Sequence, residues 1–435
     1  MNSCKSDRFR AAPKKRRVSR RGAIYVVTLG TALIVAVVAM AGIVAVRVQR
    51  GQVTEMADCM EARWYARSAL DMALFRTEHD GDWRQKMQDG VWETDQAVGS
   101  GSYSFRAVDP NDADLTNLDT DPVVIVGTGK HGRARQKLEV RLEPKADALG
   151  CLEVALFAGN DLSFTDTIVQ CDQTIGANNN VTASNSTVSA DVEAVGTISG
   201  STYQGTNTTG VDPRSVPDGT VFESYLATGT AIDVGALPLN AEGYREIRGQ
   251  VLSPLSNPFG ADLNGEGVYV IDCLGQQVVI AESRIVATII LVNPASGSGV
   301  QNVVNWEPAV ANYPALLVDG SMTFEFDNTP LSEAAVKTNF NPAGTPYLGS
   351  EDGDKKDEYP SLIKGLVYVS GDLTVHQTPT LQGVLVVGNT LLASGQAGSA
   401  VLTLTYQQTF LDNPPPGFGT LRMVVLPGSF RQVVD

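Results

Sequence analysis

The run GAIYVVTLGTALIVAVVAMAGIVAV, residues 22–46, holds twenty-five consecutive residues without a charged side chain. An apolar run longer than about 18 residues can cross the core of a bilayer as one helix. The hydrophobic region of a secretory signal is shorter, roughly 7–15 residues, and ends in a small-residue cleavage site. The run therefore predicts an α-helix that stays in the membrane as an anchor, with membrane lipid as its partner.

The charges around this run predict its orientation. Residues 1–21 form a basic leader with nine Lys or Arg and one Asp, in a chain whose net charge is −15. Because Lys and Arg accumulate on the cytoplasmic side of membrane helices, we expect a single-pass protein with a cytoplasmic amino terminus and a periplasmic or extracellular body. The leader's KKRR is also typical of nucleic-acid signals, but beyond it only residues 130–137 are basic. We therefore expect no nucleic-acid partner.

The helix is expected to continue beyond the apolar run, to about residue 80. Residues 46–76, VRVQRGQVTEMADCMEARWYARSALDMALFR, contain no proline. Their apolar and polar residues recur at helical spacing. One face is predicted to be apolar, with Val53, Met56, Met60, Trp64, Leu70 and Leu74. The opposite face carries Glu55, Asp58, Arg63 and Asp71. The pattern predicts a transmembrane helix that becomes amphipathic outside the membrane, over residues 22–80.

A leader that ends in Gly22, then Ala23, and an apolar helix that runs into YARSALDMAL, resemble the type IV pilin-like family. The segment is most similar to the PilX-type amino-terminal segment and to the minor pseudopilin K of type II secretion. In that family a prepilin peptidase cuts after the glycine. The resemblance implies processing between Gly22 and Ala23, an inner-membrane location, and partnership with the peptidase and with other pilin-like subunits of a pilus or a secretion pseudopilus.

One residue departs from the family pattern. Most pilins carry Glu at the fifth mature position, where this chain has Val27. A buried Glu neutralises the terminal amine of a neighbouring subunit, because an unpaired charge in lipid is costly. Its absence resembles pseudopilin K and suits a subunit at the filament tip. The alternative is an uncleaved single-pass envelope protein whose outer region is an adhesive or binding module.

Residues 81–148 predict a small pilin-like head with an antiparallel sheet. GSYSFRAV alternates polar and apolar residues, and PVVIVGTG and ARQKLEVRLEP follow a turn-rich loop. That loop holds five aspartates: Asp109, Asp112, Asp114, Asp119 and Asp121. Calcium prefers such oxygen ligands, and the resemblance to pseudopilin K implies a calcium site in the head. Asp, Asn and Pro are equally typical of solvated turns, so Ca²⁺ is one of two interpretations.

Residues 149–435 predict a mainly β region. Four segments share an apolar strand, a glycine turn and a second strand: VALFAGNDLSF at Gly159, ALLVDGSMTF at Gly320, LVYVSGDLTV at Gly371 and VLVVGNTLLA at Gly388. Short repeats of this kind are typical of a solenoid, and we expect a right-handed parallel β-helix. A β-sandwich is the alternative. Irregular insertions are expected near 212–261 and 328–360.

Within this β-helix, Val386 is expected in the coil interior, and Cys151 and Cys171 are expected on successive rungs. Stacked rungs lie about 4.8 Å apart, within the Cα separation that a disulfide requires. An outward-facing compartment favours such a bond. Two free thiols, or a pair that involves Cys273, are the alternatives.

Signatures of catalysis are absent from the sequence. The chain has three His, at positions 79, 131 and 376, and contains no GxSxG, HExxH or P-loop pattern. The acidic run EDGDKKDE, residues 351–358, is interrupted by two lysines and predicts a solvated loop. We therefore expect no enzyme. A polysaccharide-active β-helix enzyme, with acidic and basic residues grouped in one groove, is the third alternative.

Overall fold

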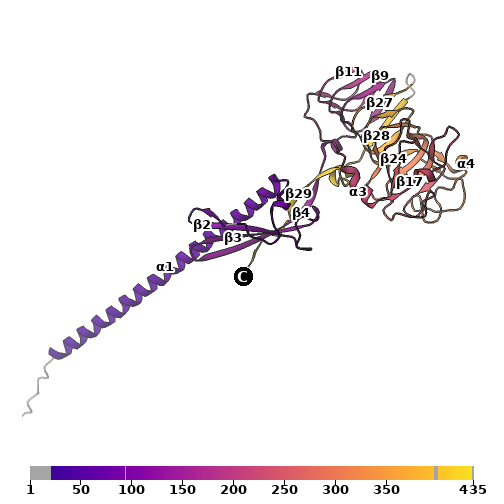
Figure 1. Cartoon of the computed structure of the whole chain (residues 1–435). Coiled ribbons are helices and arrows are strands. Elements are labelled where there is room, and N and C mark those ends of the chain that lie inside the picture. The colour runs from indigo at the N-terminus through magenta and orange to yellow at the C-terminus, as the bar shows by residue number, and fades with distance from the viewer. Residues whose placement is uncertain (1–20, 94, 396–399, 434–435) are drawn as a thin grey trace, which may run out of the picture. The chain divides into compact units, whose positions relative to one another are not determined.

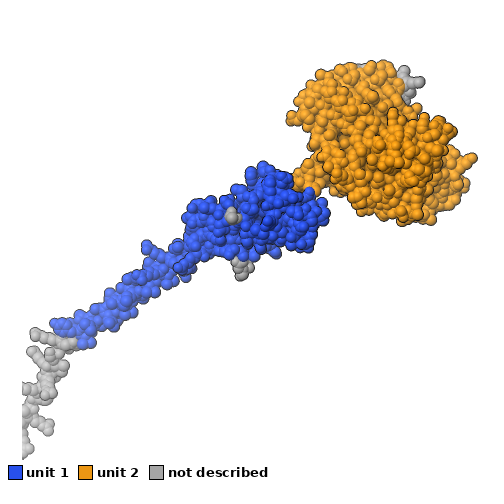
Figure 2. Space-filling view, in the orientation of Figure 1, with its two compact units in different colours: residues 1–144, 423–435 blue, residues 145–422 orange. Residues whose placement is uncertain are grey.

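The structure is a computed structural model that describes residues 21–93, 95–395 and 400–433, so most of the basic leader lies outside the described residues. The chain divides into two compact units (Figure 2): residues 1–144 together with 423–435, and residues 145–422. The sequence predicts a solenoid over residues 149–435, but residues 423–435 belong to the first unit.

The first unit combines one long helix with an antiparallel sheet (Figure 1). Its helices are α1 (Arg21–His79) and α2 (Trp83–Lys86). The sheet has the order β1-β2-β3-β4-β29, and β30 also pairs with β4. The strands are β1 (Gln96–Val98), β2 (Gly101–Val108), β3 (Val123–His131), β4 (Ala134–Ala148), β29 (Gly419–Val425) and β30 (Arg431–Val433).

Small residues set the distance between α1 and strand β3. Four alanines at helical spacing are fully buried against the sheet: Ala62, Ala66, Ala69 and Ala73. A β-carbon at Gly129 would lie 2.1 Å from the Ala62 carbonyl oxygen, and one at Gly127 would lie 2.7 Å from the Ala66 oxygen. Neither position has room for a side chain. The backbones of helix and strand therefore approach each other as closely as glycine and alanine permit.

The buried face of α1 differs from the one expected. Of the predicted apolar face, Leu70 is buried, whereas Val53, Met56, Met60 and Trp64 are exposed. Leu74 is partly buried beside the core of this unit. Apolar periodicity favours large side chains, but the sheet selects the alanine face because only small residues permit its close approach. The large apolar side chains form an exposed stripe that continues the apolar run of residues 22–46.

The second unit is a parallel β-helix, which confirms the predicted fold class and replaces the β-sandwich alternative. Its first half contains the following elements: η1 (Gly150–Glu153), β5 (Leu156–Ala158), β6 (Leu162–Thr165), β7 (Thr167–Cys171), β8 (Ile175–Ala177), β9 (Val181–Ser189), β10 (Val192–Ala194), β11 (Ile198–Tyr203), β12 (Asn207–Thr209), α3 (Val221–Thr228), β13 (Thr230–Ala231), η2 (Val234–Ala236), β14 (Arg245–Arg248) and β15 (Val251–Leu252).

The second half completes the coils and adds one excursion. It contains β16 (Val268–Asp272), β17 (Val278–Val286), β18 (Thr288–Val292), β19 (Gly299–Glu307), β20 (Pro314–Asp319), β21 (Met322–Phe326), β22 (Leu331–Ser332), α4 (Glu333–Val336), β23 (Glu358–Tyr359), β24 (Leu362–Val369), β25 (Leu373–Val375), β26 (Thr380–Val387), β27 (Leu391–Ser394), β28 (Ala400–Tyr406) and α5 (Thr409–Asp412). The segment from β22 to β23 leaves the coil as a two-stranded antiparallel excursion. Residues 212–261, in contrast, are partly coil, because β13, β14 and β15 pair in parallel with β16 and β17.

The coils do not stack in sequence order. The first half grows outward from β5 through β8 and β10 to β12. The chain then resumes at β13 and returns through β16, β18, β20 and β24 to β26. Strand β26 pairs with β5, so that Val387 registers with Ala158. The last complete coil therefore stacks on the first, in the middle of the β-helix.

This arrangement brings the two ends of the second unit together. The Leu149 amide donates a hydrogen bond to the Phe418 carbonyl oxygen at 2.9 Å. Arg422 forms an ion pair with Asp147 beside it. The β-helix is therefore a domain inserted in the chain between β4 and β29, with its two ends next to each other.

Strands β24 and β26 are buried on both faces, which is typical of continuous apolar runs in parallel sheets. The inward side chains of β26, Leu385 and Val387, belong to the coil core. Val386 was expected there too, but its side chain points outward, into a second core beneath η1, α3 and α5. Its neighbours in that core include Phe157 and Tyr368. Strand alternation decides the direction, and the covering segments bury the outer face as completely as the inner one.

Of the alternatives for Cys151 and Cys171, the structure has the free thiols and not the disulfide, and Cys59 and Cys273 are free as well. Cys151 lies in η1, ahead of the first coil strand, and packs in the outer core. Cys171 ends β7 and packs against the inner core. The two residues are therefore not stacked, although their spacing matches one coil. Burial raises the pKa of Cys151 to about 12 and that of Cys171 to about 11, so burial disfavours the thiolate form of both.

We expect the Gly129→Ala substitution to loosen the first unit by about 1–3 kcal/mol, because a methyl group there overlaps the backbone of α1. Hydrogen exchange of the β3 amides in detergent measures the effect, which should be faster exchange. Gly81→Ala is the control, since a β-carbon there meets nothing within 4 Å. Unchanged exchange in Gly129→Ala would contradict the close-packed interface.

We expect Val386→Asp to lower the stability of the second unit by about 3 kcal/mol or more, because the outer core offers an isolated carboxylate no partner. Leu392→Asp is the matched control, since Leu392 also points outward but is 44% exposed. Thermal unfolding followed by circular dichroism compares the two variants. Equal shifts in the unfolding temperature would argue against a covered outer face.

Candidate functional site

The amino-terminal half of α1 is an exposed apolar surface. Its side chains from Ile24 to Val48 are exposed, and within Ile24–His79 a stretch of at least 18 residues has the length and hydropathy needed to cross a membrane. Gly22 and Ala23, the predicted processing site, lie in the first turn of this helix. Val27 is exposed and adds no charge to this surface. An apolar helix surface of this extent requires lipid or protein around it.

Farther along α1, the exposed stripe borders a groove within the first unit. Met60 and Trp64 line the groove, and Trp64 is 67% exposed. Leu138 of β4 and Phe430 close its other side. The Arg67 guanidinium lies over the Phe430 ring, 5.1 Å from its centroid. Aromatic and arginine side chains with this exposure are typical of interaction surfaces between proteins.

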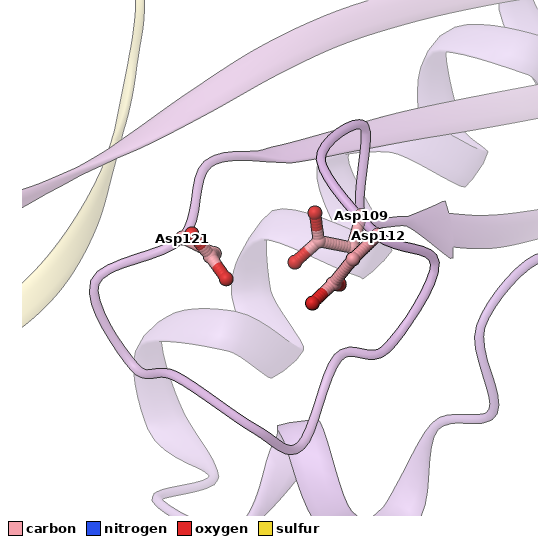
Figure 3. Close-up of side chains that lie close together, drawn as sticks. All are labelled: Asp109, Asp112 and Asp121. Atoms are coloured by element: carbon pink, nitrogen blue, oxygen red, sulfur yellow. The ribbon is translucent and has the colours of Figure 1, made fainter.

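The loop between β2 and β3 brings three of the five candidate aspartates together (Figure 3): one carboxylate oxygen from each of Asp109, Asp112 and Asp121 lies within 4.8 Å of the others. Asp109 is only 2% exposed. Its Oδ1 accepts a hydrogen bond from the Asn111 amide at 2.7 Å, whereas its buried Oδ2 has no partner. Asp121 Oδ1 accepts a hydrogen bond from Asn111 Nδ2 at 2.8 Å.

The remaining two aspartates lie outside this cluster. Asp114 accepts hydrogen bonds from the Thr116 amide and hydroxyl, which lower the pKa of its carboxyl group. Asp119 lies 3.8 Å from Arg84 Nε, and its side chain is largely exposed. The predicted five-residue set is therefore reduced to three residues.

Arg84 of α2 holds the aspartate loop in place. It is buried and donates hydrogen bonds to the carbonyl oxygens of Leu115, Asp119 and Asp121, the last at 2.7 Å. Burial is the largest cause that lowers its pKa, and the nearby aspartates act in the opposite direction. The loop is thus fixed by a cation that contacts its backbone. Within the loop, Asp112 accepts hydrogen bonds from the Asp114 amide at 3.0 Å and from Asn117 Nδ2, whereas Asp109 Oδ2 has no partner.

The clustered donors are all oxygens, so the site suits a hard cation. Calcium accepts six to eight oxygen ligands in flexible geometry, including carboxylates and waters. Zinc prefers nitrogen and sulfur, which the cluster lacks. The unpartnered Oδ2 of Asp109 fits a cation, because a buried carboxylate oxygen is costly without a donor or a metal.

A second polar group, which the sequence did not suggest, joins α1 to the sheet. His131 Nε2 lies 2.9 Å from Ser100 Oγ and 3.0 Å from Glu61 Oε2, and Nδ1 lies 3.3 Å from Asp58 Oδ1. The composition is that of a catalytic triad, but Glu61 shares the nitrogen that a serine nucleophile requires. We interpret the group as a link between helix and sheet. Its members are too scattered in sequence to form a motif.

The other two histidines have local partners. His79 stacks on Phe75 with ring centroids 4.1 Å apart. His376 Nδ1 lies 2.9 Å from the Ser394 carbonyl oxygen, on the next coil. The same nitrogen also lies 3.1 Å from Ser394 Oγ.

Comparisons with known proteins find one weak structural similarity and no match in sequence. No family model matches the sequence, and no curated protein matches it. Among solved structures, the chain is similar to the competence-associated pilin ComZ from Thermus thermophilus, with 11% sequence identity and a TM-score of 0.34. The similarity covers 87% of this chain and 98% of that chain. Both the sequence identity and the TM-score of this similarity are low.

Proposed function

We propose that this chain is a membrane-anchored, pilin-like structural subunit of the cell envelope, with a β-helix inserted into its head. The observation that carries the proposal is α1. One unbroken helix exposes an apolar surface over its first half and buries an alanine face against the antiparallel sheet over its second half. Lipid can cover the apolar half before assembly, and neighbouring helices can cover it in a filament.

The proposal extends to the position and the partners of the subunit. The leader before Gly22 supports cleavage by a prepilin peptidase, and the exposed stripe with Met60 and Trp64 supports packing against other pilin-like subunits. Val27 leaves the apolar half without the carboxylate that would meet a neighbour's amine, which favours the tip of a type IV pilus or of a type II secretion pseudopilus. We propose a structural role and no catalytic one, with the amino terminus cytoplasmic and the body outside the inner membrane.

Processing tests this proposal. We expect the membrane-extracted protein, produced together with a prepilin peptidase, to begin at Ala23 by mass spectrometry. Gly22→Val should block cleavage, because the peptidase is expected to require the glycine, and Gly30→Val is the control within the same helix. An intact Met1 in the unsubstituted protein would overturn the filament proposal. It would favour the alternative of an uncleaved anchor that carries a binding β-helix.

We further propose that Asp109, Asp112 and Asp121 bind Ca²⁺. The unpartnered buried Oδ2 of Asp109 supports this site, and Arg84 holds the loop that carries it. A bound cation would join the two ends of the loop between β2 and β3. Its role would be to stiffen the surface of the head.

We expect Ca²⁺ to slow hydrogen exchange in residues 109–121, and Asp109→Asn to weaken this effect by about tenfold in calcium concentration, since one charged ligand is lost. Asp119→Asn is the matched control, because Asp119 lies in the same loop but outside the cluster. Exchange that is indifferent to calcium, or equally affected by both substitutions, would refute the site.

A further inference from the structure

A buried arginine helps to hold the excursion from residue 327 to 361 on the β-helix, beside hydrogen bonds between Ser253 and Thr345 and from Thr338 to the Gly249 carbonyl oxygen. Arg284 of β17 is 1% exposed. It donates hydrogen bonds to the carbonyl oxygens of Phe340 at 2.7 Å, Thr345 at 2.8 Å and Pro346 at 2.6 Å. Its guanidinium also lies over the ring of Tyr347, 5.3 Å from the centroid. One side of the excursion is thus fixed to the coil.

The other side contains three carboxylates from distant parts of the segment. Glu333, at the start of α4, and Asp357, before β23, meet Asp352, and one oxygen from each lies within 4.8 Å of the others. Glu333 is fully buried. Its Oε1 accepts hydrogen bonds from the Phe340 amide at 2.6 Å and from the Tyr359 hydroxyl at 2.9 Å, and its Oε2 accepts one from the Asp357 amide at 3.1 Å.

Among the described residues, no Lys or Arg forms an ion pair with these three carboxylates. The two nearby lysines have other acceptors. Lys355 Nζ donates to the Lys337 carbonyl oxygen at 2.7 Å, and Lys356 Nζ contacts Asp354 Oδ2 at 3.0 Å. The cluster is therefore an uncompensated concentration of negative charge.

An independent observation indicates a ligand. Asn341 is 2% exposed, and its Nδ2 donates a hydrogen bond to Asp357 Oδ2 at 3.0 Å. The amide therefore lies against the cluster, yet its buried Oδ1 has no hydrogen-bond partner. A buried amide oxygen without a donor costs about 1–3 kcal/mol. A cation among the carboxylates would satisfy both this oxygen and the repulsion between the acids.

We propose that Glu333, Asp352 and Asp357, with the Asn341 side-chain oxygen, bind a divalent cation of the calcium type. All four donors are oxygens, and the exposed position of Asp352 leaves room for water ligands. Such an ion would tie the start of α4 to the residues before β23 and close the loop between them. Arg284 and the ion would then fix the excursion from opposite sides. This site is independent of the filament proposal and of the aspartate cluster in the head.

Isothermal titration of the full chain in detergent with CaCl₂ tests the site, in a background that carries Asp112→Asn and Asp121→Asn to remove the head cluster. We expect one Ca²⁺ per chain. Asp352→Asn with Asp357→Asn should weaken binding by at least about tenfold, because two charged ligands are lost. Asp354→Asn is the matched control, since it removes the same charge from the same loop outside the cluster, and it should bind as its parent does.

Limited trypsin digestion gives a readout that requires no substitution. Lys355 and Lys356 are exposed in the loop that the ion would close. Calcium should slow cleavage after these lysines at least about threefold, because proteolysis tracks local opening, and chelation should restore the rate. Absence of both binding heat and protection would overturn the proposal. So would an equal loss of affinity in Asp354→Asn, which would indicate general charge attraction.

Discussion

The pairing of β26 with β5 is the contact on which the second unit depends. Each half of the β-helix has one coil that would otherwise expose a complete row of backbone donors and acceptors. By stacking against each other, these two coils satisfy both rows and merge two short solenoids into one core. The same contact places Leu149 beside Phe418, so the inserted unit begins and ends at one point.

The first unit uses a different principle, since its helix and sheet meet through backbone proximity. Gly127 and Gly129 remove side chains from β3, and the alanines of α1 remove them from the helix. Dispersion between closely packed backbones adds to the burial of larger apolar groups such as Leu70 and Phe105. This choice leaves Met60 and Trp64 on the surface. The residues of α1 that stabilise the head are thus different from the residues that it exposes on its surface.

Much of the architecture could be predicted because it depends on local pattern. The apolar run after Gly22 and the repeated turns at Gly371 and Gly388 are sufficient to predict a long apolar helix and a parallel β-helix. The wrong predictions concern features that depend on contacts between residues distant in sequence. Periodicity cannot tell that Val386 faces a covered outer core, or that alanines, rather than Met60 and Trp64, are buried.

The candidate sites show the same limit. The aspartates of the head are close in sequence, so the loop was recognised, although two of its five members lie outside the cluster. Glu333 and Asn341 join Asp357 only because Arg284 and two short strands fold the excursion back on itself. The run EDGDKKDE, taken alone, resembles any solvated loop. Only the fold reveals that its lysines contact other acceptors.

The return stacking also determines the order in which the second unit can be completed. Synthesis delivers β5 to β12 first, and their inner edge stays unpaired until β26 to β28 arrive more than 200 residues later. Contacts so distant in sequence form slowly, and unpaired parallel edges are prone to aggregation. The first coils therefore pass through a stage in which they have a hydrophobic core but lack a lateral neighbour. A holding chaperone would act on this intermediate.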